Sequence, residues 1–220
     1  MISRLYFYSY LMVALFFSMT SVAFGQAQAP APAFKEGDTW QLKFEQQGRQ
    51  QGRTSTDQLE GIFEIKFTQG GFKLYEVEGG KGLGGEIPIM YGTDDRSERL
   101  LVGLGQNEKR LNLKFPLSVG QKWTYQYTVR PLGYPADQRR SVEVNVVGME
   151  DVTTPAGTFK TFKLVRVEGY NPNPRGGTYV RVTSTYFYSP DTKSNVKGSS
   201  KNDYNDATSQ SELVKFTPGS

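Results

Sequence analysis

The chain has 220 residues, of which 37% are hydrophobic and 22% charged, and its formal net charge is +4. This charge is too small and too evenly spread to indicate a nucleic-acid-binding protein, in which Lys and Arg gather in a stripe. Cysteine and histidine are both absent, which excludes disulfides, thiolate chemistry and the usual general base near neutral pH. Tyr, Phe, Gly and Pro are abundant, and this balance favours an all-β fold.

The first 25 residues have the pattern of a secretory signal peptide. An arginine precedes the apolar run Leu11–Phe17, and Ala23 and Gly25 are small residues at the spacing that signal peptidase requires. A membrane anchor is the alternative, but this apolar run is too short to span a bilayer. We therefore expect cleavage before Gln26, and a soluble mature chain in the periplasm or outside the cell, without a membrane span. Residues 26–33 are expected to form a disordered, Pro-containing spacer.

Alternating apolar residues predict a first β unit over residues 34–116. The polar stretch Gln46–Leu59 is expected to be a long loop or the frayed end of a hairpin. Gly70 and Gly71 separate two alternating runs, which is typical of a tight hairpin. The apolar runs of this unit are Trp40–Phe44, Phe63–Phe67, Phe72–Val77, Ile87–Tyr91, Leu100–Val102 and Leu111–Phe115.

A second β unit, over residues 117–217, repeats this order of strands and loops. Its first strand, Trp123–Val129, places four large side chains on one face because side chains alternate along a strand. Thr153–Thr158 is expected to be a turn, and Gly198–Ser211 a polar, mobile connection. The apolar runs of this unit are Trp123–Val129, Val142–Val146, Phe159–Val167, Tyr179–Tyr188 and Leu213–Phe216, with a further return strand that begins at Val196.

The two units share a motif, Gly-x-x-Trp-x-apolar-x-aromatic, at their first strands. Trp40 and Trp123 are 83 positions apart, and the Val-Glu-Gly segments that end at Gly79 and Gly169 are 90 positions apart. These similar offsets favour an internal duplication, and coincidence is the alternative because the motif is short. We expect about 10–12 strands, in two related units or in one continuous domain.

Three segments of the second half together resemble a known family. They are Phe115–Trp123, Val152–Phe159 and Tyr186–Lys193, which read FPLSVGQKW, VTTPAGTF and YFYSPDTK. Their order is similar to that in a group of uncharacterised bacterial secreted or envelope proteins with a 3108-like domain of unknown function. The resemblance covers residues 115–197. It implies an antiparallel, barrel-like or half-barrel β fold in the cell envelope, and it implies no catalytic residues.

Four tyrosines are the candidate ligand-binding residues. Tyr125 and Tyr127 share one face of their strand, as do Tyr186 and Tyr188, and together they are positioned to line a concave apolar face. One alternative is that the four rings fill the core. Another is that some tyrosine rings lie outside, as platforms for sugars or at a protein interface.

The remaining motifs have plain structural interpretations. Asp94-Asp95 is expected in a turn and Glu150-Asp151 on a solvated hairpin tip, so these carboxylates are weak candidates for catalysis. Gly79–Gly85 lacks the Gly-Lys-Ser/Thr ending of a phosphate-binding loop, and we expect a flexible connection. Asn202–Asp206 lacks the glycine and the final glutamate of a calcium loop, and we expect a mobile loop.

These observations lead to three hypotheses about function. The first is an exported, non-enzymatic β protein that binds an apolar, lipid-like ligand or an envelope partner. The second is a carbohydrate-binding or structural cell-surface module, and the third is a carboxylate-dependent hydrolase. We expect no cofactor, no metal and no nucleic-acid partner, and the sequence leaves the oligomeric state open.

Overall fold

The structure, a computed structural model, describes residues 27–49, 56–68, 71–78, 113–129, 137–171 and 177–220, and there the protein is all-β, as the sequence predicts. Nine antiparallel strands form one sheet in the order β4-β3-β2-β11-β10-β9-β8-β7-β6, and β1 pairs with β5 in a second, small sheet. The strands are β1 (Gln28–Ala29), β2 (Thr39–Arg49), β3 (Thr56–Thr68), β4 (Gly71–Glu78), β5 (Leu117–Ser118), β6 (Lys122–Val129), β7 (Gln138–Thr154), β8 (Gly157–Tyr170), β9 (Val180–Ser189), β10 (Ser194–Asn202) and β11 (Thr208–Thr217).

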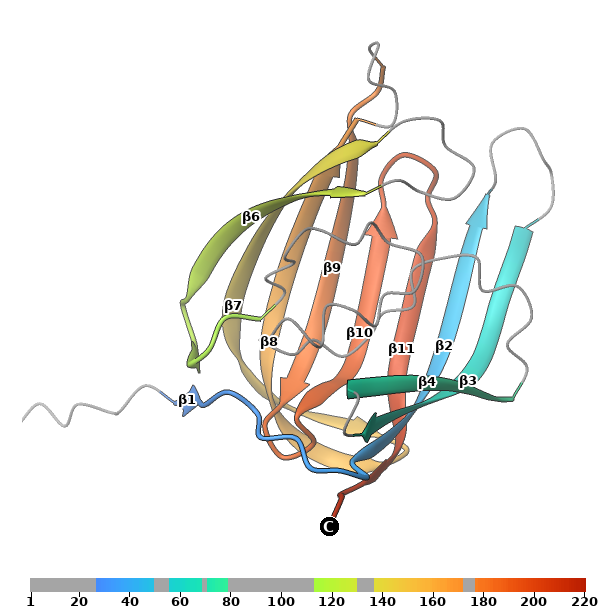
Figure 1. The fold of residues 1–220 in the computed structure, drawn as a ribbon. Helices are drawn as coiled ribbons and strands as arrows, with labels where there is room; N and C mark the ends of the chain where they lie inside the picture. The colour runs from blue at the N-terminus through green and yellow to red at the C-terminus, as the bar shows by residue number, and fades with distance from the viewer. Residues whose placement is uncertain (1–26, 50–55, 69–70, 79–112, 130–136, 172–176) are drawn as a thin grey trace, which may run out of the picture.

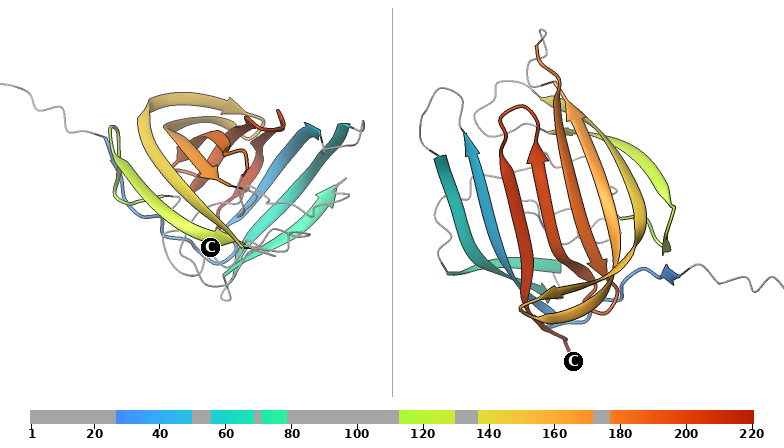
Figure 2. Two further views of the ribbon diagram at one scale, coloured as in Figure 1. Left: turned by 90° about the horizontal axis from the view of Figure 1, so that it is seen from above. Right: turned by 180° about the vertical axis from the view of Figure 1, so that it is seen from behind.

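The large sheet is strongly curved and open along one side (Figure 1). Seen from above, β6 and β7 form one arm of a U and β2 to β4 form the other (Figure 2, left). Among the described strands, β4 and β6 are the two outer ones, so the sheet does not close on itself. Of the two expected forms, the described strands make the half-barrel. We call the side of the sheet that carries both tryptophans the inner face, and the opposite side the outer face.

The two predicted β units meet inside this sheet. Strands β6 to β11 follow one another in chain order, and β11 then pairs with β2, which opens the first unit. The register of that pair places Phe216 opposite Trp40. Strands from both halves of the chain therefore share one continuous hydrogen-bonded sheet, while the internal duplication stays a prediction.

The turns before the two tryptophan strands have the same hydrogen bonds. Gly37, with φ of 90°, donates its N–H to the carbonyl of Phe67 at 2.9 Å. Gly120, with φ of 84°, donates its N–H to the carbonyl of Val146 at 2.8 Å. Glycine adopts this left-handed backbone conformation at little cost, whereas other residues do so rarely. The glycine of each Gly-x-x-Trp motif therefore has the same structural task, which is to turn the chain into its strand.

Alternation along the strands separates an apolar inner face from a polar outer face. In β6, Trp123 and Tyr127 are buried, whereas Thr124 and Gln126 are exposed. The buried apolar side chains form two clusters, which supply the stabilisation that burial provides. The first cluster contains Ala29, Leu113, Leu117, Trp123, Tyr127, Val142, Val144, Val146, Phe162, Leu164 and Tyr188, and the second contains Trp40, Leu42, Ile65, Val152, Val196 and Leu213.

The long hairpin of β7 and β8 bends across the lower end of the half-barrel (Figure 1). A bulge between Val146 and Gly148 interrupts the register of the two strands, and bulges of this kind bend a strand sharply. Beyond the bulge, Val152 is part of the second cluster, and the N–H of Ala156 donates to the carbonyl of Leu213 at 3.3 Å. The predicted turn at residues 153–158 is thus confirmed, and its tip covers the second cluster.

One buried carboxylate joins three separate segments beneath the half-barrel. Asp38 is fully buried and accepts hydrogen bonds from the N–H of Lys35 at 2.7 Å and the N–H of Gly219 at 2.8 Å. The ammonium group of Lys193, in the turn between β9 and β10, lies 2.7 Å from the same carboxylate. The start of β2, the β9–β10 turn and the C-terminal segment are therefore held together by one side chain.

The structure differs from the sequence-based expectation in three segments. In the stretch Gln46–Leu59, expected to be a long loop or a frayed hairpin end, residues 46–49 and 56–59 are paired as the ends of β2 and β3. Within the expected disordered spacer, Gln28 and Ala29 form β1, and Ala29 is buried in the first cluster. The expected mobile connection Gly198–Ser211 instead forms most of a hairpin of β10 and β11. Its small polar side chains gave no apolar alternation, but backbone pairing with β9 and β2 on either side stabilises both strands.

Candidate functional site

A charged cluster lies on the inner face, among apolar residues of β7 and β8. Arg166 and Glu168 are two residues apart in β8 and therefore point to the same face. Only 9% of Arg166 and 2% of Glu168 is exposed. A guanidinium nitrogen of Arg166 donates to one carboxylate oxygen of Glu168, and Nη1 of Arg140 in β7 donates to the other at 2.7 Å. We call these three residues the Arg–Glu–Arg cluster.

Neighbouring side chains fix the position of Arg140. Its guanidinium group lies over the ring of Tyr170, with 4.3 Å between the guanidinium carbon and the ring centre. Its Nη2 also donates to the side-chain carbonyl of Gln138 at 3.2 Å, and Gln138 is buried. Contacts between a guanidinium group and an aromatic face are favourable and orient the cation. Arg140 is therefore directed toward Glu168 from the neighbouring strand.

Electrostatics keep the cluster ionised although it is buried. Burial alone would raise the pKa of Glu168, but the charges of Arg166 and Arg140 and the hydroxyl of Tyr127 hold it below its ordinary value. Burial likewise acts to lower the pKa of Arg166, while Glu168 and, less strongly, Tyr125 hold it above its ordinary value. Removing one member of such a buried ion pair typically costs about 3–5 kcal/mol, because its partner is left charged in a poor solvent.

Three of the four predicted tyrosines surround Arg166. The hydroxyl of Tyr125 accepts a hydrogen bond from Nε of Arg166 at 3.4 Å, and the Tyr125 ring stacks on Tyr127 with 6.2 Å between ring centres. Tyr186 is close enough to contribute to the raised pKa of Arg166. Tyr125 and Tyr186 are half-buried, but only 1% of Tyr127 is exposed. A ligand on the inner face would reach Tyr125 and Tyr186 first.

The fourth predicted tyrosine lies in the first apolar cluster. Tyr188 is 1% exposed and meets the ring of Phe115 edge-on, with 5.5 Å between ring centres. Burial also raises the pKa of its phenol above the ordinary value. These contacts describe a core side chain in this structure. Ligand binding by the four tyrosines stays a prediction.

Sequence reasoning missed the Arg–Glu–Arg cluster, although one signal for it was present. Phe162 and Leu164 are buried in β8, and Arg166 and Glu168 continue the same alternation. The alternation therefore predicts that an arginine and a glutamate point into the core, where charged groups are rare unless paired. Arg140 could not be assigned in this way, because its place opposite Tyr170 depends on the register of β7 and β8.

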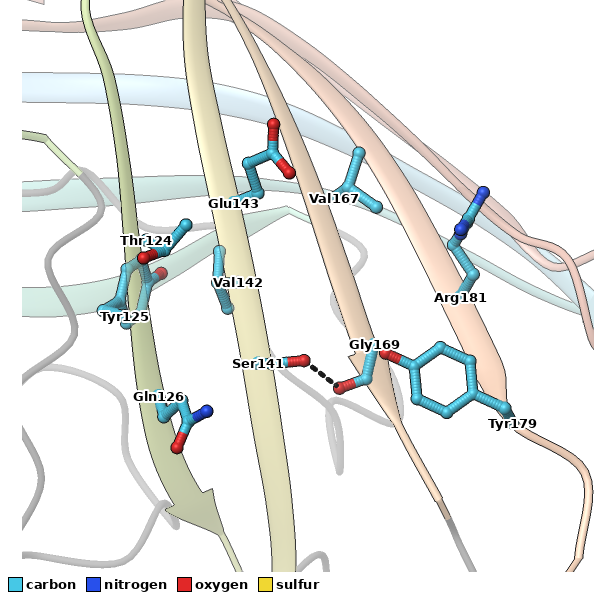
Figure 3. Close-up of a pocket in the computed structure, with 10 residues that line it drawn as sticks. All are labelled: Thr124, Tyr125, Gln126, Ser141, Val142, Glu143, Val167, Gly169, Tyr179 and Arg181. Atoms are coloured by element: carbon cyan, nitrogen blue, oxygen red, sulfur yellow. Dashed lines mark hydrogen bonds between the residues drawn. The ribbon is translucent and has the colours of Figure 1, made fainter.

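A second feature lies on the outer face, where the structure has a groove with a cavity volume of about 530 Å³ (Figure 3). It crosses β6 to β9 and was not predicted as a specific site. Its floor is low because Ser141 and Gly169, which pair across β7 and β8, have small or no side chains. The polar and aromatic groups that line it include Gln126, Ser141, Glu143, Tyr179 and Arg181.

The other motifs fall in different places. Glu150 and Asp151 are solvated as expected but lie within β7 and not at the hairpin tip, which is at residues 155–156. The carboxylate of Glu150 pairs with the ammonium of Lys163 at 3.3 Å. Asn202 and Asn205 accept hydrogen bonds from backbone N–H groups of the β10–β11 turn. Among the described residues, no three acidic side chains gather as metal ligands would. Asp94, Asp95 and the glycine run at residues 79–85 lie outside the described residues.

The described segments contain no helix with the length and hydrophobicity to cross a membrane. Comparison with protein-family models and with curated proteins finds no match for this chain.

Two solved structures are similar to it. One is an assumed lipoprotein from Parabacteroides distasonis, with 13% identity over 87% of this chain and 100% of that chain, and a TM-score of 0.46. The other is an assumed exported protein with a YmcC-like fold from Bacteroides fragilis, with 11% identity over 86% of this chain and 99% of that chain, and a TM-score of 0.43. At these scores neither likeness bears on function, and the resemblance to the 3108-like domain stays a prediction.

Proposed function

We propose that this protein is exported and binds an apolar, lipid-like ligand on the inner face of the half-barrel, without catalysing a reaction. Export is inferred from the first 25 residues, which have the three parts of a cleavable signal peptide. The observation that carries the ligand proposal is the half-buried pair Tyr125 and Tyr186 beside Arg166, next to the first apolar cluster. A half-buried aromatic ring on a curved apolar face offers contact area at a small cost in side-chain entropy.

The Arg–Glu–Arg cluster supports an amphipathic form of this ligand. Guanidinium groups bind carboxylate and phosphate groups well, and they do so more strongly where water is excluded. A ligand with an apolar tail and an anionic head would place its head near Arg166 and its tail against the first cluster. The one carboxylate of the cluster, Glu168, is buried with both oxygens bound by guanidinium groups, and the chain has neither cysteine nor histidine, which is why a binding role is favoured over hydrolysis.

The experiment uses the mature chain purified from its own cell envelope. Organic extraction followed by mass spectrometry should identify a co-purified lipid, and a fluorescent fatty-acid analogue should bind the delipidated protein. Tyr125→Ala together with Tyr186→Ala should weaken binding of this probe roughly tenfold, because each aromatic contact contributes about 0.5–1.5 kcal/mol. Tyr204→Ala, an exposed tyrosine in the β10–β11 turn, serves as the matched control.

Two results would contradict the ligand proposal. One is a protein that carries no lipid and does not bind the analogue. The other is a double tyrosine variant that binds the analogue as well as the Tyr204→Ala control does. Recovery of an envelope protein in place of a lipid would instead support the alternative of a protein partner. Full-length chain in the cytoplasm would contradict export.

A further inference from the structure

The groove on the outer face is formed by a row of four residues, one on each of four neighbouring strands, whose side chains differ in size. The register places Gln126 of β6 opposite Ser141 of β7, Ser141 opposite Gly169 of β8, and Gly169 opposite Arg181 of β9. The two inner positions of this row are small, and the two outer positions carry long side chains. Because strands in a sheet are about 4.8 Å apart, the low centre spans roughly 10 Å. The side chain of Tyr179 fills the part of this low centre that lies over Gly169.

The hydroxyl end of Tyr179 lies over Gly169. A methyl group at position 169 would overlap the hydroxyl group and the adjacent ring carbons of Tyr179, so the ring occupies the space that glycine leaves free. In Figure 3 the hydroxyl of Tyr179 points to Gly169, with the ring beside the start of β9. Even so, 60% of Tyr179 is exposed. The hydroxyl end of the side chain therefore rests on the β8 backbone, while more than half of the residue is exposed to solvent.

Polar groups of β6 and β7 lie across the groove from this ring, and hydrogen bonds fix their positions. The side-chain carbonyl of Gln126 accepts a hydrogen bond from Nε of Arg139 at 3.1 Å, and the hydroxyl of Ser141 donates to the carbonyl of Gly169 at 3.3 Å. Across the groove, the carboxylate of Glu143 accepts from Nδ2 of Asn145 at 3.1 Å. The groove thus has polar side chains on one side and an exposed aromatic side chain on the other.

We propose that this groove binds a pyranose unit of a glycan chain, with the sugar ring stacked on Tyr179. A pyranose has a face of C–H groups that packs on an aromatic ring, and its hydroxyls need donors and acceptors at the edge of that ring. Arg181 and Glu143 carry opposite charges and lie on opposite sides of the floor (Figure 3). Hydroxyl groups both donate and accept, so they suit this mixed lining better than an anion or a hydrocarbon does.

The volume of the groove and the contact that positions Tyr179 agree with this assignment. A volume of about 530 Å³ lies within the roughly 300–1,000 Å³ of small-molecule sites. Tyr179 is already in contact with Gly169 before a ligand binds, so its side chain loses little further conformational freedom on binding. The groove is on the opposite face of the sheet from Arg166 and Tyr186, so it is independent of the proposed lipid-like ligand.

The test is binding of the labelled mature chain to an array of bacterial and plant oligosaccharides, followed by affinity electrophoresis in dextran, laminarin, galactomannan and alginate. The chain should bind at least one pyranose-containing probe. Tyr179→Ala should weaken that binding about tenfold or more, because it removes the stacking surface. Tyr179→Phe should retain it, and Tyr204→Ala is the matched control for loss of an exposed tyrosine.

Gly169→Ala is the more specific variant, because it leaves Tyr179 in the chain but displaces its ring. Binding should fall as it does for Tyr179→Ala, at a melting temperature that shows a folded protein. If Gly169→Ala does not fold, Tyr179→Ala provides the test of the glycan site, because the largely exposed side chain of Tyr179 can be removed with the fold intact. Absence of binding to every probe overturns the proposal, as does undiminished binding by Tyr179→Ala. Unchanged glycan binding by Tyr186→Ala, a change outside the groove lining, would show that the two sites are separate.

Discussion

Removal of the Asp38 carboxylate tests how the lower end of the half-barrel is held together. Asp38 is fully buried and receives two backbone N–H groups and the ammonium of Lys193. In Asp38→Ala these donors lose their acceptor, and breaking a buried charged pair in this way typically costs about 3–5 kcal/mol. For a chain of this size, 1 kcal/mol corresponds to roughly 2–4 °C in melting temperature. The expected decrease is therefore about 6–20 °C at pH 7.

The same carboxylate predicts a dependence of stability on pH. Burial alone would raise the pKa of Asp38, but the N–H of Gly219, the ammonium of Lys193 and the N–H of Lys35 together hold it below its ordinary value. The unfolded chain then binds the proton more readily than the folded protein does, so stability increases with pH in this range. The stabilisation that the Asp38 carboxylate contributes is complete above the ordinary pKa of about 4. It is lost as pH falls through the lower pKa that Asp38 has in the folded state.

The assay is thermal unfolding followed by circular dichroism, at steps from pH 7 to pH 3. The parent protein should melt well above Asp38→Ala at pH 7, and the difference should shrink below about pH 4. Asp191→Ala is the matched control, because Asp191 is an exposed aspartate in the same β9–β10 turn that carries Lys193. An Asp38→Ala protein that melts within about 2 °C of the parent at pH 7, or a difference that stays constant down to pH 3, would refute this reasoning.

Three further changes test other parts of the structure. Trp123→Ala removes a buried indole at a cost of about 3–5 kcal/mol, so soluble expression or a cooperative melt should be lost; a melt within a few degrees of the parent would contradict its place in the core. Glu168→Gln leaves two guanidinium groups side by side and should destabilise to a similar extent, and adding Arg166→Met should recover part of the loss in urea unfolding. No recovery would mean that the two residues are not coupled. N-terminal sequencing of exported protein should start at Gln26, and a start at Met1 would exclude cleavage.

The strand faces were predictable because alternation is a local property. Trp123 and Tyr127 are buried on one face of β6, as the period of two predicts, and Val142 to Val146 follow the same rule in β7. The turn between β7 and β8 was also predictable, since Pro155 and the glycine at position 157 are turn residues. The β10–β11 hairpin was not, because serine-rich strands have no apolar period and depend on their neighbours for stability.

By itself the sequence determined the all-β class, the faces of the tryptophan strands, and the absence of cysteine and histidine chemistry. The tertiary structure alone decided that β11 pairs with β2, that Arg140 reaches Glu168 from the next strand, and that Tyr179 rests on Gly169. The physical reason is that side-chain alternation is set within one strand, whereas register is set between strands. Both candidate sites are built across strands, so neither could be assembled from any one segment of the chain.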